Sequence, residues 1–477
     1  MTKEIVKQLD RIFKARSMAV IGASNTPGKW GHRMMHNPLT TGYRGAIYPV
    51  NPNEKQISGL PAFKNVRDIP GEVDLAVIVV PAALAPQAMA DCGVKGIKGV
   101  VMITAGFAET GAEGQALQDE VVRTARQAGI RFVGPNGMGI YTSAVNLSLC
   151  FDVAPRRGKI AFVSQSGTFG GLLAQIAGTK GYGLSKFISI GNQADLKAGD
   201  YLEYLAEDDD TAAIVFYMEG FKDGRHFFEL AREVIRHKPI IIYKAGKTEA
   251  AVRATMSHTS SIAGSDAVFE AMCKQVGIIR APETVQIFDM AEALVNMPLP
   301  RGNRVGIIGS GGQGVVVSDT CEMLGLKVPA LDVETRMQLK KGLPPHAPVP
   351  SNPVDFAGGN RSALDEAKAA DFLAQIDYID GVICNLPSVR YSEYVTPEIA
   401  RTAIQGAEIL AAIPKKYGKP VVTLRWRMGG GGDVVQSIVR NAGIPSYETP
   451  EQCARAMYAL AEYGRVRRMY GEENTNI

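Results

Sequence analysis

The chain has 477 residues, of which 46% are hydrophobic and 21% are charged, and its formal net charge is +4. This length is too great for one hydrophobic core and predicts about three domains, while the composition is that of a soluble globular protein. So small a net charge gives no reason to expect nucleic acid or an anionic membrane as the partner.

No segment has the features of an exported or membrane-inserted protein. The first residues form an amphipathic pattern instead of a signal peptide, and the most apolar stretch, 75–90, is interrupted by Pro81 and Pro86. The six cysteines are scattered without a CxxC pair, which indicates neither a disulfide framework nor a zinc site. We therefore expect a cytoplasmic protein with no metal site in this chain.

Two linker-like stretches, 154–158 and 298–303, divide the chain into segments 1–154, 155–299 and 300–477. Each segment begins with a short apolar strand, a glycine- and serine-rich turn and a helical pattern. Continuous apolar runs of this kind are typical of parallel strands buried on both faces. Later strands are expected at 75–80, 99–103, 213–218, 240–243, 381–385 and 420–424.

The sequence therefore predicts an α/β protein of three doubly wound parallel-sheet domains. The second and third segments also look like an internal pair, because VSQSG (163–167) and IGSGG (308–312) occupy equivalent places in them.

The three glycine-rich turns have two readings. A turn from a strand to a helix favours glycine in any α/β domain, but a helix N-terminus also offers free N–H groups to an anion. The first loop, Gly22 to Gly28, does not have the GxGxxG pattern of a nicotinamide site. The next strand ends in Asn51 where such a site needs an acidic residue, and Lys55 follows. This favours a ligand with phosphate near its ribose, as in CoA.

Five motifs then occur in order: GASNTPGKWG (22–31), YPVNP (48–52), VVPA (79–82), TAGFAE (104–109) and GPNGMG (134–139). Together they resemble the CoA-binding domain of ADP-forming acyl-CoA synthetases, which are related to the succinyl-CoA synthetase alpha subunit. The resemblance extends from about residue 9 to 465. It implies a Rossmann-like CoA-binding domain over 1–154, then a flavodoxin-like phosphohistidine domain over 155–299 and a flavodoxin-like ligase domain over 300–477. The cofactor residues that it implies are Ser24, Pro27, Lys29, Lys55, Pro81, Thr104, Ala105, Gly106 and Asn136.

One of the six histidines, His258, stands in a distinctive context. The run SHTSSIAGSD (257–266) resembles the phosphohistidine loop of this family, with Ser260 in place of the usual glycine and Ile262 in place of leucine. A neutral imidazole is nucleophilic when its second nitrogen is held in the right tautomer, and a carboxylate can do this. By the resemblance, Glu219, which follows a strand in the same segment, is that partner; from the residues alone, a solvated strand-end glutamate is an equal reading.

A phosphorylated histidine needs its negative charge stabilised, and two helix N-termini are available for this. The resemblance implies that paired helices from two domains hold the phosphate, through residues Ser166, Gly167, Thr168, Gly311, Gly312, Gln313 and Gly314. The NPVD motif, 352–355, is common in the ligase domain of the family, and turn formation accounts for it.

The implied reaction is acid + CoA + ATP ⇌ acyl-CoA + ADP + phosphate, through phosphorylated His258 and an acyl phosphate. The chain has no GxxxxGK[ST] loop and no ATP-grasp-like region, so ATP and Mg²⁺ are expected on a partner ATP-grasp beta subunit. Residues 191–195 border the acyl site by resemblance, but they do not select one carboxylic acid. The main alternative is a non-catalytic CoA-binding regulatory protein. A nicotinamide dehydrogenase and an AMP-forming ligase fit less well.

Overall fold

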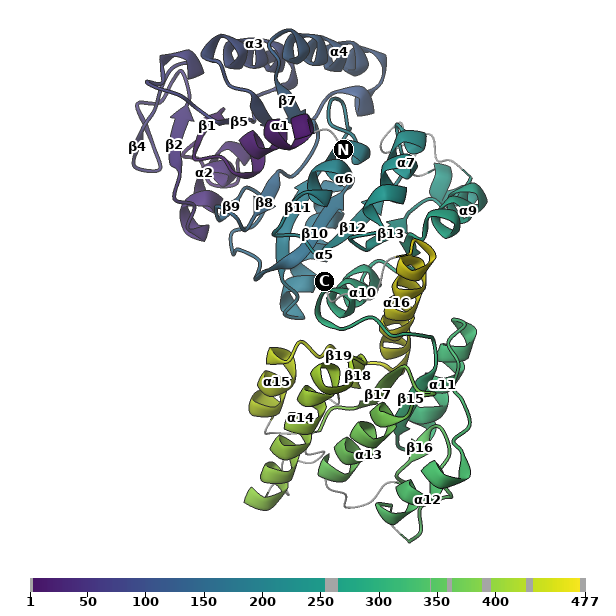
Figure 1. Cartoon of the computed structure of the whole chain (residues 1–477). Coiled ribbons are helices and arrows are strands. Elements are labelled where there is room, and N and C mark those ends of the chain that lie inside the picture. Colours follow the sequence, from purple (N-terminus) through teal and green to yellow (C-terminus); the bar gives the residue numbers. More distant parts are fainter. Residues whose placement is uncertain are drawn as a thin grey trace. The chain divides into compact units, whose positions relative to one another are not determined.

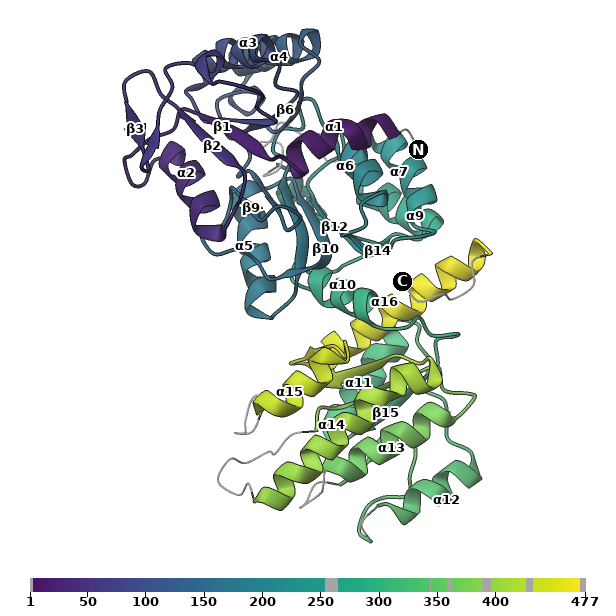
Figure 2. The ribbon, with the colours of Figure 1, turned by 60° about the vertical axis from the view of Figure 1, so that its left-hand side comes forward.

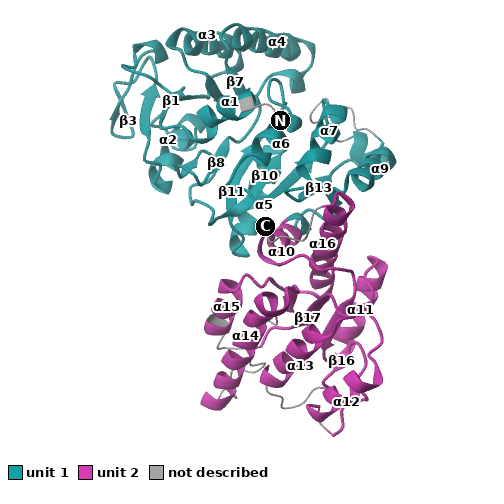
Figure 3. Cartoon of the chain, in the orientation of Figure 1, with its two compact units in different colours: residues 1–287 teal, residues 288–477 magenta. Residues whose placement is uncertain are grey.

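The computed structural model describes residues 3–253, 265–343, 345–357, 363–387, 396–425 and 432–471. These residues form two compact units, 1–287 and 288–477, which Figure 3 shows in different colours. None of the helices within the described ranges is both long and apolar enough to cross a bilayer.

The first half of unit 1 contains a five-stranded parallel sheet. In sheet order its strands are β2 (Ala46–Val50), β1 (Ser17–Ile21), β5 (Leu75–Ile78), β6 (Gly99–Met102) and β7 (Arg131–Val133). Every residue of β5 and β6 is buried, which explains their uninterrupted apolar sequences. Helices α3 (Ala85–Lys95) and α4 (Ala112–Gln127) lie side by side on one face, and α1 (Lys3–Phe13) and α2 (Trp30–Thr41) lie on the other (Figure 1 and Figure 2).

The second half of unit 1 contains a seven-stranded sheet with an antiparallel edge. In sheet order its strands are β14 (Ile279–Arg280), β13 (Ile240–Lys244), β12 (Ala213–Met218), β10 (Arg157–Ser164), β11 (Leu184–Ser189), β8 (Ile140–Thr142) and β9 (Leu147–Ser148). The first five of these pair in parallel in the flavodoxin order 2-1-3-4-5. Strands β8 and β9 follow β7 in the chain and pair antiparallel to β11, so the two halves share this sheet.

Unit 2 contains one five-stranded parallel sheet with the same 2-1-3-4-5 order. Its strands are β16 (Val354–Asp355), β15 (Val305–Gly309), β17 (Gly381–Asn385), β18 (Val421–Leu424) and β19 (Ser446–Tyr447). Helices α13 (Ala363–Gln375) and α14 (Pro397–Tyr417) pack together, and α11 (Gly312–Met323) packs on α16 (Pro450–Met469). The predicted fold class, three doubly wound parallel-sheet domains, is confirmed.

The remaining elements connect these layers. They are β3 (Gln56–Ile57), β4 (Leu60–Pro61), η1 (Val66–Asp68), η2 (Ala82–Leu84), η3 (Ala108–Thr110), α5 (Gly167–Thr179), α6 (Ala198–Ala206), α7 (Gly224–Val234), α9 (Asp266–Val276), α10 (Gln286–Asn296), α12 (Val333–Lys341) and α15 (Gly432–Asn441).

The six later strands predicted from the sequence are all present: β12 and β17 have the predicted bounds, β13 is one residue longer, and β5, β6 and β18 are shorter by one or two residues. The first predicted linker is partly wrong, because Arg157 and Gly158 already belong to β10. The two compact units divide within α10, at 287 and 288. The segment boundaries after residues 154 and 299 stay predictions.

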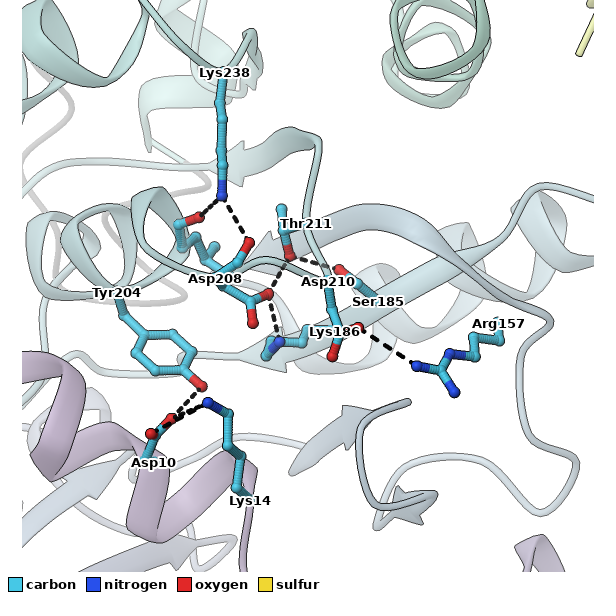
Figure 4. Close-up of polar contacts among 11 residues, drawn as sticks. Asp10, Lys14, Arg157, Ser185, Lys186, Tyr204, Asp208, Asp210, Thr211 and Lys238 are labelled. Carbon is cyan, nitrogen blue, oxygen red and sulfur yellow. Dashed lines mark hydrogen bonds and ion pairs between the residues drawn. The ribbon is translucent and has the colours of Figure 1, made fainter. Parts of the chain in front are cut away.

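Two separate groups of polar contacts lie around α6, and one of them joins the two halves of unit 1 (Figure 4). Lys186 on β11 forms an ion pair with Asp208 in the α6–β12 connection, and both side chains are nearly inaccessible. Thr211 and Lys238 also donate to Asp208, while Tyr204 on α6 donates to Asp10 on α1. Removing one charge of such a buried pair costs about 3–5 kcal/mol. These contacts fix the segment after α6 to β11 and hold α6 itself against the N-terminal helix.

Candidate functional site

A cleft of about 620 Å³ opens in unit 1 where several parallel strands end. We call it the unit 1 cleft. It is lined by Gly22, Ser24, Gly28, Lys29, Trp30, Gly31, Val79, Val80, Pro81, Ile103, Thr104, Ala105, Asn136, Gly137, Met138, Gln165, Ser166, Gly167, Thr168, Gly191 and Asn192. These residues follow β1, β5, β6, β7, β10 and β11, at the carboxyl ends where doubly wound sheets bind ligands.

The loop after β1 brings backbone close to the cleft. Gly22 has φ +94°, and a Cβ there would lie 2.7 Å from the Val79 carbonyl oxygen. A Cβ on Gly31 would lie 2.0 Å from the carbonyl oxygen of Gly22. Helix α2 begins at Trp30, and the side chain of its N-cap, Lys29, makes no capping hydrogen bond. The loop thus exposes a helix N-terminus and an ammonium group, which suit phosphate groups.

Six of the nine residues predicted to bind the cofactor line this cleft: Ser24, Lys29, Pro81, Thr104, Ala105 and Asn136. The other three lie outside the lining. Pro27 is exposed in the loop after β1, and Gly106 donates its N–H to Glu109. Lys55 is exposed in the segment after β2. The carbonyl of its neighbour Gln56 accepts from Asn25 in the loop after β1.

The turn after β10 forms another wall of the cleft. Ser164 Oγ donates to the Ser166 carbonyl over 2.7 Å, and a Cβ on Gly170 would lie 2.2 Å from that same Oγ. Helix α5 begins at Gly167, and the Ser166 side chain does not cap it. All three predicted phosphate residues here, Ser166, Gly167 and Thr168, line the cleft.

Glu219 lies next to this turn through Gln165. Gln165 Oε1 accepts from the backbone N–H groups of Glu219 at 2.9 Å and Gly220 at 3.1 Å. Glu219 is only 7% exposed. Burial, and after it the charge of Glu219, raises the pKa of the nearby Tyr217 hydroxyl well above its ordinary value. The predicted nucleophile, His258, lies outside the described residues.

The chain matches known families over both halves of unit 1. Residues 16–143 match the CoA binding domain family, and residues 157–294 match the succinyl-CoA ligase like flavodoxin domain family. It is 42% identical to the alpha subunit of acetate–CoA ligase [ADP-forming] II of Pyrococcus furiosus, over 96% of this chain and 98% of that one. The chain belongs to the ADP-forming acyl-CoA synthetases, as an alpha subunit. These enzymes are acid–thiol ligases. The family match confirms the resemblance that the sequence motifs indicated.

Two further relatives share the same family. Acetate–CoA ligase [ADP-forming] I of Archaeoglobus fulgidus is 38% identical over 96% of this chain, which spans 64% of that longer protein. Acetyl-coenzyme A synthetase 1 of Ca. Korarchaeum cryptofilum, solved in complex with phosphate and ADP, is 34% identical with a TM-score of 0.84. That alignment covers 97% of this chain and 98% of the solved one.

The end of β2 differs from a nicotinamide site, as the sequence indicates. Asn51 follows the strand, and its Nδ2 donates to the Ala23 carbonyl over 2.8 Å. Its Oδ1 accepts from the backbone N–H of Asn53. Asn51 therefore shapes the loop of this synthetase and is not free to hold a ribose hydroxyl.

Sequence reasoning gave no role to a carboxylate behind the cleft, Glu109 in η3. Its Oε1 accepts from the backbone N–H groups of Gly106 and Phe107, and its Oε2 accepts from Asn192 Nδ2. Burial raises the pKa of Glu109, but these hydrogen bonds outweigh it and hold the pKa below its usual range. Glu109 is therefore ionised at neutral pH. The TAGFAE motif was the one signal that contained it.

The second predicted phosphate turn lies in unit 2. Helix α11 begins at Gly312, after Gly311 with φ +59°, whose N–H donates to Asp355 Oδ1 over 3.1 Å. Gln313 Nε2 donates to Asn385 Oδ1 at the end of β17, over 2.7 Å. Gly314 packs against Pro353, so that a Cβ there would lie 3.1 Å from the proline ring. The NPVD motif thus supports this turn, through Asp355 and Pro353, a contact that the sequence did not predict.

Proposed function

We propose that this chain is the CoA-binding, histidine-carrying subunit that converts a small carboxylic acid, CoA and ATP into acyl-CoA, ADP and phosphate. The observation that carries the proposal is the composition of the unit 1 cleft. One cavity is lined both by the loop after β1, with Ser24 and Lys29, and by the turn after β10, with Ser166 to Thr168. A site for the phosphates of CoA and a site for a transferred phosphoryl group would thus share one space.

CoA would be held mainly by the first half of unit 1. Lys29 and the N-terminus of α2 offer positive charge to its phosphates, and Ser24, Pro81, Thr104 and Ala105 line its path. Pro27, Lys55 and Gly106 lie beside this path and not along it, so we assign them weaker roles. When bound, CoA supplies the thiol, and the proposal puts Asn136 near it.

The phosphoryl group would be carried by His258. The imidazole attacks the γ-phosphorus of ATP, the bond to ADP breaks, and phosphohistidine forms. A carboxylate oxygen of the acid then attacks this phosphorus and frees the imidazole, giving an acyl phosphate. The acyl phosphate finally transfers its acyl group to the thiol and releases phosphate. In this scheme Glu219 holds the imidazole tautomer, and its fixed place beside Gln165 suits that role.

Charge neutralisation would come from helix N-termini, as phosphoryl transfer requires. The start of α5, at Ser166, Gly167 and Thr168, is the first, because the Ser166 side chain does not cap it. The start of α11, at Gly311, Gly312, Gln313 and Gly314, is the second.

ATP and Mg²⁺ would be bound by a separate ATP-grasp beta subunit. This sequence spans 64% of the Archaeoglobus relative. The remaining third of that protein is long enough for a further domain. The relative from Pyrococcus furiosus is itself named an alpha subunit. A cytoplasmic location belongs to this proposal, since the six cysteines are buried as free thiols.

Calorimetric titration of the purified chain with CoA and, separately, with Mg-ATP tests this division of function. We expect CoA to bind and ATP not to bind, and acyl-CoA synthesis from a panel of acids to appear only with the partner subunit. ATP binding or synthesis by the chain alone would contradict the assignment of ATP to a partner. CoA binding without synthesis in the presence of the partner would instead support a non-catalytic CoA-binding regulator.

A further inference from the structure

Three side chains from distant parts of the sequence form a hydrogen-bonded relay at the wall of the unit 1 cleft. Glu109 Oε2 accepts from Asn192 Nδ2 over 2.5 Å, and Asn192 Oδ1 accepts from Asn136 Nδ2 over 3.2 Å. Asn192 is 9% exposed, and Asn136 and Asn192 both line the cleft. Glu109 lies behind them and does not line it.

The other contacts of the relay leave its members little freedom. Asn192 Nδ2 also donates to the buried Gln118 over 3.1 Å. Glu109 Oε1 is occupied by two backbone donors, Gly106 N–H at 2.6 Å and Phe107 N–H at 3.1 Å. Asn136 has φ +59° and its N–H donates to the Thr104 carbonyl, which holds its backbone against the loop after β6. The relay therefore connects three loops around the cleft.

The chemistry of a carboxylate sets the direction of the whole relay. An ionised carboxylate accepts hydrogen bonds and cannot donate them, whereas an amide does both and can be turned over. Facing Glu109, Asn192 must present its Nδ2, which leaves its Oδ1 toward Asn136. Asn136 must then present its Nδ2 to Asn192. One N–H of Asn136 and its Oδ1 are left for a ligand.

We propose that Glu109 is a positioning residue that fixes the amide of Asn136, so that the thiol end of the cleft always presents one N–H donor to the acyl oxygen of the substrate. This inference rests on the proposed function. It explains why the amide of Asn136, the donor at the acyl site, has one orientation. The substrate class that fits is an acyl group with a carbonyl oxygen next to the transferred bond.

Glu109→Gln would reverse the relay without changing its shape. The oxygen of the new amide is needed by the Gly106 and Phe107 N–H groups, so its nitrogen turns toward Asn192. Asn192 must then turn over, and Asn136 after it, which points the wrong atoms into the cleft. We expect kcat/KM for the acid to fall by about 10- to 100-fold, as for loss of a hydrogen bond to a charged group.

A second substitution should restore the direction. When Glu109→Gln is combined with Asn192→Asp, the carboxylate introduced by Asn192→Asp accepts from Asn136 and from the amide introduced by Glu109→Gln. Gln118 can turn its amide to donate to the same carboxylate. We expect kcat/KM of the double variant to return to within about threefold of wild type. This is a clear recovery from the loss of about tenfold or more that we expect for Glu109→Gln alone. Asn192→Asp alone opposes two carboxylates and should be the most damaged variant.

The experiment measures kcat and KM of the full chain with its partner subunit, and the dissociation constant of CoA for the chain alone. Glu113→Gln, on the exposed first turn of α4, is the matched control and should behave as wild type. The CoA dissociation constant should stay nearly constant across the set. A wild-type complex without ligase activity would refute the proposed function itself. An active wild type in which Glu109→Gln equals Glu113→Gln, or in which the double variant is no better than Glu109→Gln, would overturn the relay.

Discussion

The turns after β10 and β15 begin two folds with the same strand order, and they are supported in related ways. In each, a glutamine reaches across to the end of the neighbouring strand: Gln165 accepts from Glu219 and Gly220, and Gln313 donates to Asn385. In each, a helix starts at a glycine without a capping side chain.

The two turns differ in where they place negative charge. After β10 the carboxylate is that of Glu219, which follows the neighbouring strand β12 and whose backbone N–H donates to Gln165. After β15 the strand end carries an amide, Asn385, and the carboxylate is Asp355, which accepts directly from Gly311 N–H. The same scaffold therefore has a buried glutamate beside one turn and an aspartate bound to the other, and we propose different roles for the two carboxylates.

Removing the charge of Glu219 should have the largest effect. Glu219→Gln keeps the size of the side chain and the backbone bonds to Gln165 but loses the charge that, in the proposed function, orients the imidazole. We expect phosphorylation of His258 in the reconstituted enzyme to slow by about 10²–10⁴-fold. Rapid-quench labelling with γ-labelled ATP measures this rate. Glu229→Gln, at an exposed position of α7, is the control, and a Glu219→Gln rate equal to the control would leave Glu219 as a structural residue.

Matched Gly→Ala substitutions in the two turns should have a smaller effect, which appears in the free energy of unfolding. A Cβ on Gly167 would lie 3.0 Å from Met138 Cγ, whereas a Cβ on Gly312 meets nothing within 4 Å. We expect Gly167→Ala to lower stability by about 1–3 kcal/mol through crowding. Gly312→Ala should be neutral or slightly stabilising, because alanine restricts the unfolded chain. Scanning calorimetry compares the two variants, and equal destabilisation would contradict the difference in packing.

The charge of Asp355 should have the smallest effect. Asp355→Asn keeps an oxygen for the N–H groups of Gly311 and Ala357, so the turn should remain intact. Loss of a negative charge at a helix N-terminus should tighten the binding of inorganic phosphate to this turn by up to about fivefold, from about 1 kcal/mol. Phosphate titration by NMR measures it. Weaker binding in Asp355→Asn would show that the carboxylate organises the site and does not oppose the anion.

Much of the fold could be predicted because parallel strands buried on both faces leave a continuous apolar signature. β12 and β17 occur where the sequence places them. The antiparallel addition of β8 and β9 could not be predicted, since these strands are short and their partner β11 comes later in the chain. Their pairing depends on tertiary packing, which local periodicity does not encode.

The site could be predicted in part, and for a similar reason. Ser166, Gly167 and Lys29 lie at strand-to-helix turns, where glycines and charges mark them locally. The hydrogen bonds among Glu109, Asn192 and Asn136 have no such mark, although each residue lies in a stretch that the sequence singled out, because these bonds connect three separate loops. Amide and carboxylate partners of this kind have no spacing in the sequence that would reveal them.

The central claim is that a histidine of this chain carries the phosphoryl group, and locating that group on the chain tests it most directly. The complex with its partner subunit is incubated with γ-labelled ATP, and the label is mapped by mass spectrometry under alkaline conditions. We predict an acid-labile, alkali-stable phosphoryl group on His258, lost together with turnover in His258→Asn, while CoA binding by that variant is retained. Full turnover in His258→Asn, or a label at another residue, would contradict the account.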